Sequence, residues 1–104
     1  MSILFIDTSN NKAITVSLEI NGKKDTLTKE VGRERSQLVL PLIKELLAKH
    51  SFKIEDVEKI QVEIGPGSFT GLRVGVAVAN ALGMVLQIPI NDNPVGKLVE
   101  PVYS

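Results

Sequence analysis

The chain has 104 residues, and 12 lysines and arginines balance 12 aspartates and glutamates, so the formal net charge at pH 7 is zero. This length allows one domain with one small hydrophobic core, and the balanced charge argues against a protein that binds polyanions over its whole surface. The chain has no cysteine and one histidine, which excludes disulfides, a thiol nucleophile and a metal site built from several histidines.

The first third of the chain predicts three β-strands. Residues 3–6 form a continuous apolar run, typical of a strand that is covered on both faces. Apolar and polar residues alternate from Ile14 to Ile20, which predicts a strand with one buried face. Asn21-Gly22 favours a tight hairpin turn, and the lysines of the returning segment, about residues 24–31, are typical of an edge strand.

The rest of the chain predicts two helices and two further strands. In chain order we expect a helix from about Arg35 or Ser36 to His50, a strand at residues 60–64, a loop at Gly65–Gly71, a second helix to about Gln87 and a short fifth strand at residues 88–90. A strand–helix–strand crossover implies parallel pairing, so the order predicts an α/β fold with a mixed five-stranded sheet and two main helices packed on it. We expect a single domain at residues 1–91 and a proline-containing tail at residues 92–104.

The segment between the fourth strand and the second helix, GPGSFTG, has the composition of an anion-binding loop. Ser68 or Thr70 can cap the helix, and unpaired amides at a helix start suit an anion. Asp7, at the end of the first strand, and Arg73, in the helix, complete a weak candidate set for an anion or nucleotide. The lysine of a phosphate-binding P-loop is missing, so a tight structural turn is favoured here, and an Asx turn is favoured at Asp7.

The second helix is apolar in nearly every direction. Its only strongly polar residues, Arg73, Asn80 and Gln87, are seven apart and form one narrow stripe, which also interrupts the segment enough to argue against a membrane span. Gly75, Ala79 and Gly83 form a smooth ridge that a second helix could approach closely. This ridge packs either on the first helix of the same chain or, as we favour, on a partner.

The first helix is also broadly apolar, so the two helices together predict an exposed partner surface. The predicted interface residues are Leu40, Ile43, Leu47, Arg73, Gly75, Val76, Ala79, Asn80 and Gly83. The start of the chain lacks the pattern of a secretory signal, and we expect a cytoplasmic location.

Three segments resemble the TsaB (YeaZ) family: IDTS at residues 6–9, LPLI at residues 40–43 and, most specifically, GPGSFTGLRVG at residues 65–75. The resemblance covers residues 2–91. It implies the ribonuclease H-like fold shared with actin and sugar kinases, and a role in threonylcarbamoylation of an adenosine beside the tRNA anticodon. In that family TsaB is a non-catalytic scaffold that binds and activates the transferase TsaD, joined by the ATPase TsaE, and its two amino-terminal helices form a four-helix bundle with a partner.

The resemblance also implies that this chain alone binds no cofactor or metal, that the complex uses ATP and a divalent metal, and that tRNA is contacted indirectly. Family members carry a second similar domain, which residues 1–104 do not include, so we expect no interdomain cleft within this chain. Glu63 and Arg35 stand where the family often has glycine and histidine. Two alternatives stay open: a small nucleotide-binding or hydrolytic enzyme that uses Asp7 and the Gly65–Gly71 loop, and a stand-alone homodimer built by the same helices.

Overall fold

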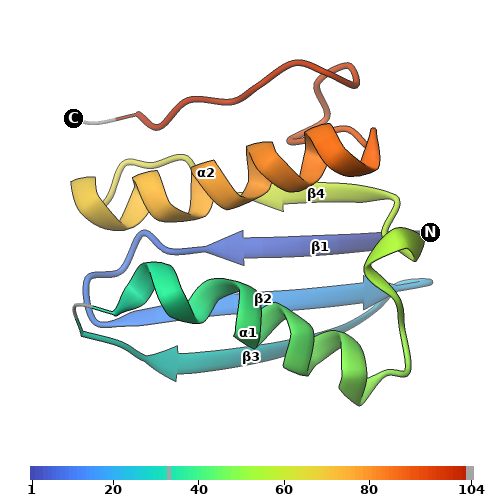
Figure 1. Ribbon diagram of the computed structural model, residues 1–104, viewed down its shortest axis with the longest axis horizontal. Helices are drawn as coiled ribbons and strands as arrows, with labels where there is room; N and C mark the ends of the chain where they lie inside the picture. Colours follow the sequence, from blue (N-terminus) through green and yellow to red (C-terminus); the bar gives the residue numbers. More distant parts are fainter. Residues whose placement is uncertain (33, 103–104) are drawn as a thin grey trace.

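Four strands form one mixed sheet in the computed structural model, which describes residues 1–32 and 34–102 (Figure 1). The strand order is β3-β2-β1-β4; β1 pairs antiparallel with β2 and parallel with β4, and β2 pairs antiparallel with β3. The elements are β1 Ser2–Asp7, β2 Ala13–Ile20, β3 Lys23–Glu30, α1 Arg35–Lys49, a 3₁₀ turn at Ile54–Asp56, β4 Lys59–Val62 and α2 Phe69–Leu86. The structure therefore confirms the first four of the five predicted strands and both predicted helices. It also confirms the predicted parallel pairing, which joins β1 and β4.

The predicted fifth strand at residues 88–90 is wrong, because this segment makes only an isolated bridge to β4 at Ile90. Pro89 has no amide to donate to a ladder, and Asn91 adopts a positive φ of 51°, so the backbone turns away from the sheet. The Asn91 side chain substitutes for the missing backbone partner: its Oδ1 accepts from the Val62 amide at 2.7 Å and its Nδ2 donates to the Val62 carbonyl at 3.0 Å. At this edge of the sheet, the side-chain amide of Asn91 therefore pairs with β4 in place of a fifth strand.

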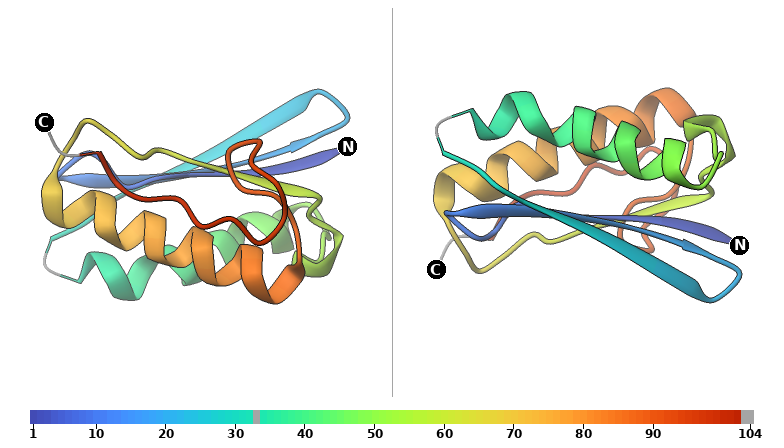
Figure 2. Two further views of the ribbon diagram at one scale, coloured as in Figure 1. Left: turned by 90° about the horizontal axis from the view of Figure 1, so that it is seen from above. Right: turned by 90° about the horizontal axis from the view of Figure 1, so that it is seen from below.

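Both helices lie on the same face of the sheet, as Figure 2 shows. α1 packs over β2 and β3, α2 packs over β1 and β4, and the inner sides of both helices join the strands in one apolar core. The fully buried centre of this core consists of Leu4, Ile6, Ile14, Leu18, Val39, Leu46, Ile60 and Leu72. On the opposite face of the sheet no helix of the described chain packs, and Ile3 and Phe5 are only partly buried there, with the Lys24 ammonium 3.9 Å from the centre of the Phe5 ring. The expectation that residues 3–6 are covered on both faces is therefore wrong for the part of the chain that the structure describes.

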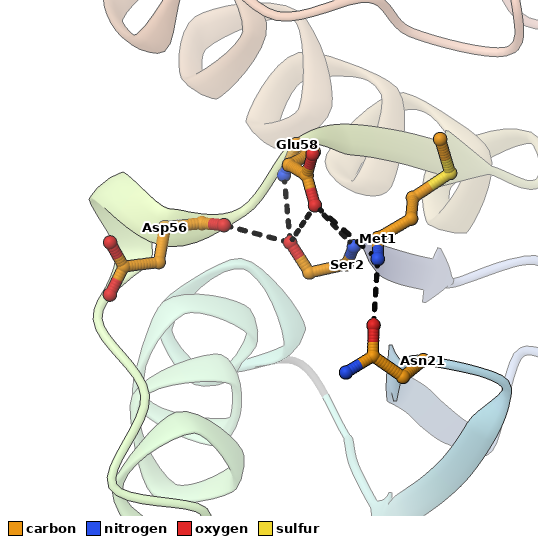
Figure 3. Close-up of polar contacts among 5 residues, drawn as sticks. All are labelled: Met1, Ser2, Asn21, Asp56 and Glu58. Atoms are coloured by element: carbon orange, nitrogen blue, oxygen red, sulfur yellow. Dashed lines mark hydrogen bonds and ion pairs between the residues drawn. The ribbon is translucent and has the colours of Figure 1, made fainter.

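The start of β1 is held by a cluster of polar contacts that joins three separate parts of the chain (Figure 3). The Ser2 amide donates to the Glu58 carboxylate at 2.8 Å, and the Ser2 hydroxyl donates to the Asp56 carbonyl at 2.7 Å. The amino terminus of Met1 donates to Asn21 Oδ1 in the β2–β3 turn at 2.9 Å. These bonds fix the register of β1 against the hairpin on one side and the approach to β4 on the other.

Candidate interaction surface

The inner side of α2 rests directly on β1 and on the segment that follows the helix. Ala79 is fully buried, and a Cβ added to Gly75 or Gly83 would overlap Thr8 or Ile90, respectively. The ridge of Gly75, Ala79 and Gly83 therefore faces the sheet of its own chain, and the prediction that it faces a partner is wrong. Val76, also in the predicted interface, is 4% exposed and belongs to the same inner side.

Thr8 explains why α2 needs glycines on this side. Its hydroxyl donates to the Gly71 carbonyl at 2.5 Å and accepts from the Gly75 amide at 3.0 Å, so it sits between two backbone groups one helical turn apart. Both bonds are buried, and any side chain at Gly71 or Gly75 would displace the threonine. The small residues thus allow a strand end to contact the helix backbone.

The outer sides of the two helices form a separate, exposed surface, which we call the helix-pair surface. It consists of Ser36, Leu40, Lys44 and Ala48 on α1, and Thr70, Arg73, Ala77, Ala81, Met84 and Val85 on α2, all of them exposed. Several of its large apolar side chains are solvent-accessible to an unusual degree: Leu40 is 53%, Met84 55% and Val85 80% exposed.

Two hollows lie along the groove between the helices. The first, of about 460 Å³, is lined by Leu40, Ile43, Lys44, Leu47, Ala48, Phe52, Ile54 and Leu82. The second, of about 450 Å³, is lined by Ser36, Thr70, Arg73, Val74, Ala77 and Val78. The structure therefore places four predicted interface residues, Leu40, Ile43, Leu47 and Arg73, along this groove, where Ile43 and Leu47 form part of the floor.

The charges on the helix-pair surface are basic. In the described ranges neither Lys44 nor Arg73 has a carboxylate within 4.0 Å, and the Arg73 guanidinium lies 5.5 Å from the centre of the Phe69 ring. Two cations without an acidic partner therefore flank a largely apolar groove.

Asn80 does not contribute to this surface. Its side chain pairs with the backbone of Val99, donating to the carbonyl and accepting from the amide, both at 2.9 Å. The Val102 amide donates to the Ile64 carbonyl at 2.6 Å, so the segment after α2 runs along α2 and β4 (Figure 1). Assignment of Asn80 to a partner interface is thus corrected: its amide group holds the tail of the same chain. A lone asparagine in an otherwise apolar helix is the sequence feature that could have indicated this contact with the tail.

The four residues of the candidate anion set do not converge. Asp7 Oδ1 accepts from the Ser9 amide at 2.9 Å and the Ser9 hydroxyl at 2.6 Å, as in an Asx turn, and Asp7 lines a hollow on the helix-free face. Ser68 caps α2 by accepting from the Gly71 amide at 3.3 Å, and it lines a different hollow together with Thr70. Arg73 lies on the helix-pair surface instead.

The residue beside Ser68 and Thr70 is Arg35, which the candidate set left out. Its position as the first residue of α1 was visible in the sequence, but only the fold brings it under the start of α2. Within residues 1–32 and 34–102, no group of three or more histidine, cysteine, aspartate or glutamate side chains is arranged to hold a metal ion.

By length and composition, α2 is the one helix in the described chain that is apolar enough to cross a membrane, with a mean hydropathy of 1.6. Its inner side, however, carries Leu72, Val76 and Ala79 into the core of the sheet. Its apolar character therefore serves two packing surfaces, one within the chain and one on the helix-pair surface.

Comparisons with known proteins agree with this architecture. Residues 19–92 match the family model of TsaD, tRNA N6-adenosine threonylcarbamoyltransferase. The chain is 33% identical over 90 residues to the tRNA threonylcarbamoyladenosine biosynthesis protein TsaB of Haemophilus influenzae, which covers 86% of this chain and 38% of that protein. It is 37% identical over 95 residues to TsaB of Bacillus subtilis, covering 88% of this chain and 40% of that protein.

The same relationship is seen in three dimensions. The structure of YeaZ from Pseudomonas aeruginosa superposes with a TM-score of 0.81 at 31% identity, covering 86% of this chain and 41% of that one. The chain thus spans about two fifths of the length of these relatives. On these grounds the chain belongs to the tRNA N6-adenosine threonylcarbamoyltransferase family, in which it corresponds to the amino-terminal portion of TsaB (YeaZ) proteins.

Proposed function

We propose that this chain is a non-catalytic subunit that binds a TsaD-like threonylcarbamoyltransferase through the helix-pair surface and supports threonylcarbamoyladenosine formation in tRNA. The observation that carries the proposal is the groove between α1 and α2, with two largely apolar hollows beside exposed Leu40, Met84 and Val85. The relatives are named tRNA threonylcarbamoyladenosine biosynthesis proteins, and these names support a role for this chain in that process.

The physical argument concerns water. Each Å² of apolar surface removed from water contributes about 25 cal/mol, so covering this groove favours association. A pair of helices from a partner would extend the α1–α2 layer into a four-helix arrangement, in which side chains of one pair fill the grooves of the other. Residues such as Ala77 and Ala81 leave room for a closely approaching helix.

The basic residues supply orientation. Lys44 lines the hollow beside Leu40, and Arg73 lines the hollow beside Thr70, so the two cations lie at separate positions along the groove. A partner that places acidic residues opposite them would be steered into one register, since complementary charges add specificity and association rate more than raw affinity.

A non-catalytic role is supported by how the candidate catalytic groups are used. Asp7 is engaged by Ser9, and the Gly65–Gly71 loop starts and caps α2. In this proposal the ribonuclease H-like fold serves as a scaffold, a TsaE-like ATPase joins the complex, and the complex rather than this chain uses ATP and a divalent metal. The chain forms a homodimer when its partner is absent, contacts tRNA indirectly and acts in the cytoplasm.

The test compares two matched substitutions. Leu40 and Leu98 are 53% and 50% exposed, but only Leu40 lies on the helix-pair surface. We expect Leu40→Asp to weaken binding to the TsaD of the same organism by about 10- to 100-fold in calorimetry or co-purification, because a charge enters an apolar contact. Leu98→Asp should bind like the parent. Equal binding by all three proteins would reject the helix-pair surface as the docking site.

A further inference from the structure

Arg35 is a buried cation without a partner. It is 7% exposed, its Nε is buried and makes no hydrogen bond, and no carboxylate of residues 1–32 or 34–102 lies within 4.0 Å of it. A buried charge without compensation is strongly unfavourable. A bound anion would compensate the charge of Arg35, and the described chain does not itself provide one.

The guanidinium lies under the first turn of α2. A Cβ added to Gly71 would overlap an Arg35 guanidinium nitrogen and the Thr8 carbonyl oxygen, so only glycine allows this approach. α2 is an 18-residue helix, and the positive end of its dipole lies at this first turn. Two independent features, a buried arginine and a long helix start, therefore converge.

Between them lies a hollow of about 340 Å³. It is lined by Asn11, Gly32, Arg35, Ser36, Ser68, Thr70 and Val74. Its lining offers the fork of donors on Arg35, the hydroxyls of Ser36, Ser68 and Thr70, and the Asn11 amide group, whereas no carboxylate lines it. Donors from several directions around one cation suit a tetrahedral oxyanion better than a planar carboxylate.

We propose that this hollow binds a phosphate group, carried either by free inorganic phosphate or by a small phosphorylated metabolite such as a nucleotide. Arg35 holds two of its oxygens, and the start of α2, through Thr70 and the hydroxyl of Ser68, holds the others. The site goes beyond the proposed partner binding and does not depend on it. Ser36, Thr70 and Val74 line both this hollow and the neighbouring hollow of the helix-pair surface, so a bound phosphate would tie the starts of α1 and α2 together beside that surface.

The experiment uses the 104-residue chain in chloride buffer. Thermal unfolding and amide NMR shifts are followed while inorganic phosphate, AMP, ATP or acetate is added at matched ionic strength. We expect phosphate to raise the unfolding midpoint, because a ligand that binds only the folded state stabilises it, and to shift the amides of Thr70 and Gly71. A much larger response to ATP or AMP than to phosphate would identify a nucleotide as the source, and equal responses would identify the phosphate group alone.

Two variants separate this site from general charge effects. Arg35→Met removes the buried charge and should weaken phosphate binding about tenfold or more, whereas Arg73→Met, at an exposed arginine of α2, should leave it unchanged. Arg35→Met is expected to fold, because an apolar side chain replaces an unpaired buried charge. If it does not fold, Arg35→Lys, which keeps the charge but loses the fork, should bind phosphate several-fold more weakly. A parent that responds no more to phosphate than to chloride, an acetate response equal to that of phosphate, or an unchanged response in the Arg35 variants would overturn the proposal.

Discussion

The inner and outer sides of α2 are built from the same kinds of residue. Gly75, Ala79 and Gly83 face the sheet, whereas Ala77 and Ala81, at the same helical spacing, are exposed on the outer side. On the inner side, missing side-chain atoms let Thr8 reach the helix backbone. On the outer side, they leave a groove that a second helix can enter. Small residues at helical spacing therefore signal close approach, but not whether the approaching element belongs to the same chain.

The largest effect should follow from enlarging the inner side. We expect Ala79→Leu to lower the free energy of unfolding by about 1–3 kcal/mol, since a fully buried position against the sheet has no room for three more carbons. Chemical denaturation measures this directly. Ala81→Leu, the matched change on the outer side, should stay within about 0.5 kcal/mol of the parent. Destabilisation by Ala81→Leu with a stable Ala79→Leu would invert the assignment of the two sides.

The outer side should instead respond in self-association. In the absence of a partner we expect a homodimer in which two helix-pair surfaces meet across a two-fold axis. Ala77→Lys adds a third cation beside Lys44 and Arg73 on each copy and should weaken this dimer about tenfold, with an unchanged circular dichroism spectrum. Sedimentation at tens of micromolar, an order set by ordinary weak-dimer affinities, measures it.

Val95→Lys is the control for the dimer, because Val95 is also exposed, at 51%, but lies in the segment after α2. A parent protein that sediments as a monomer at these concentrations would refute self-association by this surface. Weakening by Val95→Lys alone would place the contact elsewhere on the chain.

Sequence patterns predicted the strands and helices well because alternation and helical spacing are local. They could not orient α2, since an apolar residue occurs at almost every angle around it, and both the Gly75 ridge and the Ala77 face satisfy the same spacing. The prediction of a fifth strand was wrong for two reasons. The first is local and visible in the sequence, because Pro89 has no amide to donate. The second is long-range and not visible in the sequence, because the Asn91 side chain hydrogen-bonds the backbone of Val62 in β4. The burial of Arg35 was not predicted, because its environment is created by a contact with the start of α2, across the fold.

A smaller effect concerns the segment that borders α2 on the side of Asn80. Asn80→Ala removes two part-buried hydrogen bonds to Val99 and should lower the free energy of unfolding by about 1–2 kcal/mol. Because these bonds tether the tail rather than the core, hydrogen exchange should rise at residues 97–102 and stay unchanged in β1. Faster exchange throughout the sheet would show that Asn80 supports the core as well.

The smallest effect lies far from both sides of α2, where the edge strand meets the end of α1. Hydrogen bonds from Lys49, at 2.9 Å, and from His50, at 2.7 Å, lower the pKa of Asp25 from 3.8 to about 2. A carboxyl group whose pKa is lower in the folded state stabilises the fold above its unfolded pKa, and this contribution is lost as the pH falls through the folded pKa. We therefore expect the parent to be more stable than Asp25→Asn at pH 5–6, with a difference that shrinks between about pH 4 and pH 2. Because the Asp25 side chain is only partly buried, the difference should be small and should also shrink in high salt, which screens such pairs. Denaturation series at several pH values, at low and high salt, measure both trends. A difference that persists unchanged at pH 2 would mean that the asparagine disturbs the β3–α1 contact itself rather than its charge.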